Sequence, residues 1–60
     1  MQKATFTVYE AAEYIGVGRN TMYQLVKEKN FPSIRIKKQI RIPIKALDHW
    51  LETEAAKELN

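Results

Sequence analysis

The sequence predicts an α+β domain, mainly α-helical, in which two short helices precede a two-stranded hairpin and a third helix. Three observations support this fold: helical spacing of apolar residues in 8–29, apolar-basic alternation in 34–42, and helical spacing again after residue 43. The 60 residues, 45% of them hydrophobic, are enough for one small domain over residues 1–60. We expect a flexible N-terminus at 1–5, and a segment 53–60 that frays or contacts a partner.

The first helix is expected over Val8 to Ile15. Thr7 and Glu10 have the spacing of a capping box, in which each side chain binds the other residue's backbone N–H. Gly16 suits the left-handed residue that ends a helix. The apolar residues of this helix recur at helical spacing: Val8, Ala11, Ala12 and Ile15.

The second helix is expected over Arg19 to Lys29, after the tight turn 16–18. Its apolar stripe is Met22, Leu25 and Val26, and its other side is polar. Phe31-Pro32 ends it, because the residue before a proline avoids the helical region. Two short helices joined in this way are the outline of a helix-turn-helix.

The hairpin is expected from Ile34-Arg35-Ile36 and Ile40-Arg41-Ile42, joined by the turn Lys37-Lys38-Gln39. We expect all four isoleucines to face the core and both arginines to face solvent or a ligand. A third helix then follows Pro43; it is predicted to about Glu52, with a less certain continuation to Leu59. Helix, turn, helix, hairpin and helix make a small winged helix. Four further residues are expected to build the core: Phe6, Phe31, Leu47 and Trp50.

The charge is concentrated in the middle of the chain. The net charge is +3 overall, but it is −1 over residues 1–18, +7 over residues 19–45 and −3 over residues 46–60. A block of this kind is the electrostatic footprint of a protein that binds a polyanion, although a solvated face of scattered lysines has the same composition.

The composition also excludes several classes of function. With no cysteine, one histidine (His49) and seven carboxylates, we expect no catalytic residues, no metal site and no cofactor. We expect no small-molecule ligand, no membrane contact and no secretory signal, and hence a cytoplasmic protein.

Several segments together resemble one known family. Residues 7–17, TVYEAAEYIGV, resemble the T-x-x-E-A-A-x-x-L-G-V opening of the excisionase-type helix-turn-helix family, relatives of the MerR-like winged helices. Residues 19–26 resemble its second helix, residues 31–36 and 40–43 its wing, and residues 46–51 its last helix. The resemblance covers about residues 6–51. The sequence departs from the family pattern at Gly18, where a serine usually caps the second helix, and at Lys37, where the wing turn often has glycine.

This resemblance implies binding to double-stranded DNA, with the second helix in the major groove and the wing against the backbone or minor groove. By position, the candidate groove residues are Arg19, Asn20, Thr21, Tyr23, Gln24 and Lys27. The wing tip would be Lys37, Lys38 and Gln39, with Arg35 and Arg41 on its exposed strand face.

Residue chemistry suggests a role for each candidate. Arg19 could pair with a guanine edge or contact a phosphate, while Asn20 or Gln24 suits adenine. Thr21 could bind a phosphate or be a neutral spacer. Tyr23 could contact a sugar or a thymine methyl, or pack against the wing. The expected phosphate anchors are Lys27, Lys37 and Lys38.

The leading hypothesis is an excisionase, or recombination directionality factor, of a bacterial mobile element. The short chain is expected to have no room for an effector or catalytic domain. An excisionase would bind and bend DNA as several neighbouring copies and help a partner integrase, for which the acidic segment 52–59 is the expected contact. The alternatives are a small transcriptional regulator and, in another class, a protein-interaction adaptor that uses the helix-turn-helix as scaffold.

Overall fold

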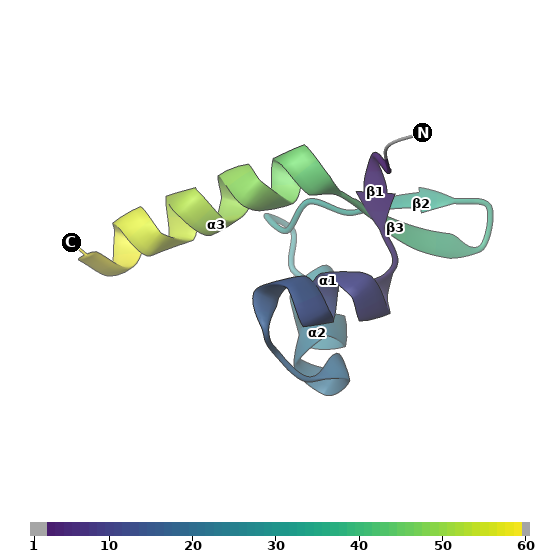
Figure 1. Ribbon diagram of the computed structural model, residues 1–60, viewed down its shortest axis with the longest axis horizontal. Helices are drawn as coiled ribbons and strands as arrows, with labels where there is room; N and C mark the ends of the chain where they lie inside the picture. Colours follow the sequence, from purple (N-terminus) through teal and green to yellow (C-terminus); the bar gives the residue numbers. More distant parts are fainter. Residues whose placement is uncertain (1–2, 60) are drawn as a thin grey trace.

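The computed structural model describes residues 3–59 and contains the predicted winged helix-turn-helix fold, with one additional strand. In Figure 1, α1 and α2 lie together on one side of the sheet. The turn of the hairpin and the far end of α3 point in opposite directions. The elements follow one another as β1 (Thr5–Phe6), α1 (Val8–Ile15), α2 (Arg19–Val26), β2 (Ile34–Ile36), β3 (Gln39–Pro43) and α3 (Ile44–Leu59).

The first helix has the predicted boundaries. The Thr7 hydroxyl accepts the Glu10 N–H at 3.1 Å, and the Thr7 N–H donates to the Glu10 carboxylate at 2.9 Å, so the capping box is complete. Gly16 ends the helix with φ 89°, the left-handed conformation that glycine adopts without a steric penalty. Its N–H and that of Val17 both donate to the Ala12 carbonyl.

The second helix is shorter than predicted and ends at Val26 rather than Lys29. Beyond it the N–H groups of Lys27, Glu28 and Phe31 donate to carbonyls three residues earlier, so the chain continues in tight turns. These turns bring the Phe31 side chain into the core, where its ring lies edge-on to Trp50 at a centroid distance of 4.9 Å. A helix continued to Lys29 would not make these turns.

The sheet has three antiparallel strands in the order β1-β3-β2. The strand β1 was not predicted; it pairs Thr5 with Pro43 and Phe6 with Ile42. The Ile44 N–H also donates to the Ala4 carbonyl at 3.0 Å. Of the segment 1–5 that we expected to be flexible, Thr5 is therefore paired in the sheet, and residues 1–2 lie outside the described residues.

The predicted orientation of the wing strands is wrong for β2. The turn has two residues, Lys37 and Lys38, because Gln39 already pairs with Ile36. With three turn residues, Ile36 would face Ile40 and all four isoleucines would share one side. Removing one residue from the turn reverses the side on which each β2 side chain lies. Ile34 and Ile36 are therefore 46% and 52% exposed.

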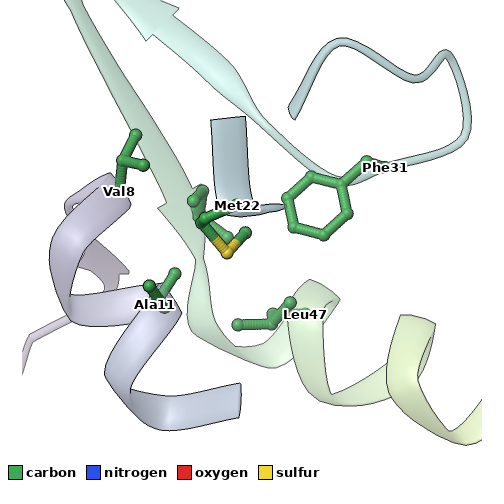
Figure 2. Close-up of a cluster of buried hydrophobic side chains, with 7 residues drawn as sticks. Val8, Ala11, Met22, Phe31 and Leu47 are labelled. Carbon is green, nitrogen blue, oxygen red and sulfur yellow. The ribbon is translucent and has the colours of Figure 1, made fainter. Parts of the chain in front are cut away.

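The core lies where the helices meet β3. Figure 2 shows Met22 of α2 between the Val8 and Ala11 side chains of α1 and those of Phe31 and Leu47. Met22, Ile42 and Leu47 are fully buried. Of the four predicted core residues, Phe31 and Leu47 are buried, while Phe6 and Trp50 are partly buried and pack against the core. The complete buried set is Val8, Ala11, Ala12, Met22, Phe31, Ile42 and Leu47.

The third helix begins directly after β3 and continues past Glu52 to Leu59. Leu47 anchors its first turns, and Leu51 is half-buried. Figure 1 shows its far end projecting away from the other elements. Near that end Lys57 and Glu54 form an ion pair at 3.2 Å. No helix within residues 3–59 is long and apolar enough to span a bilayer.

Replacing Lys37 by glycine should not destabilise the fold. Lys37 has φ 57°, a left-handed conformation that costs a non-glycine residue about 1–2 kcal/mol. Glycine removes this penalty but adds about 0.4–1 kcal/mol of backbone entropy cost. We expect Lys37→Gly to raise the free energy of unfolding by about 0.5 kcal/mol and Lys38→Gly to lower it by a similar amount. Urea unfolding tests this; equal losses for both variants would contradict it.

The ionised Glu10 carboxylate should make stability depend on pH. The pKa of Glu10 lies below its ordinary value of 4.5, first because Lys3 donates a hydrogen bond to the carboxylate and then because the Thr7 N–H does. A lowered pKa in the folded state means that ionised Glu10 stabilises the fold above the ordinary pKa, and that this contribution disappears as the pH falls through the lowered pKa.

Glu10→Gln keeps an oxygen acceptor but cannot ionise. We expect the difference in unfolding free energy between the wild type and this variant to shrink as the solution is acidified, in urea titrations at several pH values. Glu13→Gln, which removes a charge from the same helix outside the capping box, gives the background. A difference that stays constant with pH would refute this linkage.

Candidate nucleic-acid interface

The outer face of α2 carries five of the six predicted groove residues, and the sixth, Lys27, directly follows the helix. Burial of Met22 fixes which side of the helix faces the core, and Leu25 and Val26 are half-buried beside it. The opposite side is open to solvent because no other element covers it. Its exposed side chains are Arg19, Asn20, Thr21, Tyr23, Gln24 and Lys27. The first four, together with Gly18, line a hollow at the start of the helix.

Arg19 is held by a residue that sequence reasoning missed. Its Nη1 donates to the Tyr9 hydroxyl at 3.0 Å, and its guanidinium carbon lies 5.0 Å from the centre of the Tyr9 ring. Both distances are typical of a hydrogen bond and a cation–π contact. Tyr9 thereby limits the rotamers of a long side chain at the first position of α2. The helical periodicity of α1 places Tyr9 on the surface, but the contact depends on how the 16–18 turn orients the two helices.

The wing carries its cations at and beside the turn. Lys37, Lys38 and Gln39 are exposed, although Gln39 belongs to β3 rather than to the turn. Arg35 is exposed, whereas Arg41 is half-buried and its Nε donates to the Thr5 hydroxyl at 3.1 Å.

The predicted common face for Arg35 and Arg41 is wrong. In the observed register Arg35 lies opposite Ile40, and Arg41 lies opposite Ile34. Directly paired residues share a side of the sheet, so the two arginines point to opposite sides. Ile40 packs against the core, which places Arg35 on the side of the sheet that also carries the core. The wing thus presents cations on both faces rather than on one.

A groove joins α2 to the wing. We call it the wing groove, and it encloses about 390 Å³. Tyr23 contributes from α2, Tyr9 from α1, and Lys38 and Arg41 from the wing. The groove brings together candidates from two elements that are distant in sequence. Its complete lining is Thr7, Val8, Tyr9, Tyr23, Lys38, Gln39, Ile40 and Arg41.

The acidic residues lie elsewhere. Glu10 and Glu13 of α1 line a separate hollow with Phe6 and Tyr14. Asp48 accepts a hydrogen bond from the Tyr14 hydroxyl at 2.6 Å, which joins α3 to α1 and raises the pKa of Tyr14. Of the eight cations in residues 19–45, the fold places Arg19 on α2 and four on the wing, while Lys27 and Lys29 follow α2 and Lys45 lies at the start of α3. Among the side chains that the structure describes, residues 3–57, no three of His, Cys, Asp or Glu gather as a metal ion would need.

Comparison with known proteins agrees with this architecture. A family model described as a helix-turn-helix domain matches residues 5–59, nearly the whole chain. No curated protein and no solved structure matches the chain. The match includes both helices of the helix-turn-helix, the wing and α3. The chain therefore belongs to the family of helix-turn-helix domains, and it is a DNA-binding protein of that family.

Proposed function

We propose that α2 enters the major groove of double-stranded DNA while the turn of the wing contacts the adjacent backbone or minor groove. The observation that carries this proposal is the wing groove, because it joins Tyr23 of the second helix to Lys38 of the wing in one surface. Polar side chains cover the exposed face of α2, as base readout requires. The cations of the wing suit phosphate contacts, which position a protein but do not read sequence.

The individual roles follow from these positions. Arg19 and Asn20, at the start of α2, are the side chains that we assign to base edges, with Gln24 one turn further on. Lys27, Lys37 and Lys38 are assigned to phosphates, and Thr21 and Tyr23 to the backbone beside them. Arg35 and Arg41 point to opposite sides of the sheet. We therefore expect at most one of them to contact the same DNA strand as the wing tip.

We further propose that the chain acts as an excisionase that binds and bends DNA and helps an integrase to excise a mobile element. Support comes from the resemblance over residues 6–51. The end of α3 adds to it, because this part of the helix projects away from the wing (Figure 1) and carries the exposed Glu52 and the half-buried Glu54. That end is the surface we assign to a recombinase or to a neighbouring copy on DNA.

The DNA-binding proposal is tested by removing wing and α2 cations. Replacing Arg19, Lys37 and Lys38 together by alanine should lower the affinity for duplex DNA strongly. If four to six phosphates are neutralised in the wild type, its log–log salt slope should be roughly −4 to −5, and each lost phosphate contact should reduce the slope by about 1. Lys57→Ala removes one positive charge from the far end of α3 and should leave both the affinity and the salt slope unchanged.

Fluorescence anisotropy at several salt concentrations measures both quantities. Unchanged affinity in the triple variant, or no duplex binding by the wild type, would favour the adaptor over a DNA-binding protein.

The excisionase proposal is tested by reconstituted excision with the cognate integrase. We expect the wild type to stimulate excision. The variant Glu52→Gln, Glu54→Gln should bind DNA normally but stimulate less, because it removes negative charge from the projecting part of α3. Specific promoter occupancy without any stimulation of excision would instead indicate a transcriptional regulator.

A further inference from the structure

The wing groove occupies the place where a DNA strand must pass. The major and minor grooves of a duplex are separated by a sugar–phosphate strand. A domain with its second helix in one groove and its wing tip in the next must therefore accommodate that strand between them. Between α2 and the turn of the wing lies the wing groove. This step rests on the proposed function, because it requires both elements to be on the DNA.

The lining of the wing groove suits a sugar–phosphate strand. Lys38 and Arg41 supply positive charge for the phosphates, and the Tyr9 and Tyr23 rings supply flat apolar surface for the sugars. Hydroxyl groups and cations are the common partners of phosphate oxygens. The hydrogen bond from Arg41 Nε to Thr5 holds one edge of the guanidinium and leaves its terminal amino groups for another acceptor.

The Tyr9 hydroxyl can donate a hydrogen bond while it accepts the one from Arg19. A phenol carries one proton and two lone pairs. The Tyr9 oxygen accepts from Arg19 Nη1 at 3.0 Å, which uses a lone pair and leaves the proton free to be donated. Accepting a bond from a cation polarises the hydroxyl and makes it a stronger donor. The side chain is 51% exposed, so an oxygen from outside can reach that proton.

We propose that the wing groove seats the strand between the two DNA grooves, and that the Tyr9 hydroxyl donates to one of its phosphates while it orients Arg19. Tyr9 is thus a binding and positioning residue that neither the sequence pattern nor the family match assigns. One phosphate contact on α1 is thereby linked to the base-reading side chain on α2. The phosphate draws the hydroxyl towards the strand, and the hydroxyl holds the guanidinium in place.

Two phenylalanine variants test this proposal. Tyr9→Phe removes the hydroxyl and keeps the ring under Arg19. Tyr14→Phe is the matched control, because Tyr14 is equally exposed on the same helix and bonds Asp48 rather than Arg19. The probe is a duplex that the wild type selects from a randomised library, and thermal unfolding shows that each variant is folded. We expect Tyr9→Phe to weaken binding about tenfold, as for loss of a hydrogen bond to a charged group. Tyr14→Phe should bind like the wild type.

The phosphate itself is located by replacing single phosphates of the selected duplex with neutral methylphosphonates. At one position we expect the replacement to lower the DNA affinity of the wild type but not that of the Tyr9→Phe variant, because this variant already lacks the phosphate contact. That non-additivity separates a phosphate contact from a general loss of stability.

Each contrary result has a distinct meaning. The role of Tyr9 is refuted if Tyr9→Phe binds DNA as tightly as the wild type. It is also refuted if every methylphosphonate lowers the DNA affinity of both proteins by the same factor. In both cases the DNA-binding proposal stands. If the wild type selects no duplex at all, the proposed function fails, and the inference fails with it.

Discussion

The central strand β3 is the constraint on which the rest of the domain depends. It forms hydrogen bonds with β1 on one edge and β2 on the other, and α3 begins at the residue after it. The side chain of Ile42 is completely buried at the point where α1 and α3 meet the strand. A shift of one residue would move Ile42 to the opposite face and expose the core. The position of the wing relative to α2 therefore depends on the packing of Ile42.

Local signals in the sequence were sufficient to predict the helices. The capping box at Thr7 and Glu10 and the left-handed Gly16 define both ends of α1 through contacts within a few residues. The exposed face of α2 followed from helical periodicity in the same way. Its C-terminal end did not, because the tertiary packing of Phe31 draws the chain out of the helix.

The sheet and the Arg19 contact depend on information that local patterns do not hold. The hairpin orientation depended on whether Gln39 belongs to the turn, and alternation of isoleucine and arginine is compatible with either register. The strand β1 has only two residues and no periodicity that could reveal it. The contact between Tyr9 and Arg19 joins two helices, so it exists only once the turn between them has its final geometry.

The exposed isoleucines of β2 have a consequence for the protein in solution. The strand lies at the edge of the sheet and presents Ile34 and Ile36 to solvent, a combination that invites edge-to-edge pairing between copies and aggregation. Arg35, between the isoleucines, and Lys37 and Lys38, directly after them, place positive charges beside this edge. Two such edges repel each other, so these cations act as gatekeepers of solubility. A polyanion bound at these cations would screen that repulsion, so the charges that hold DNA are also the ones that keep two free copies apart.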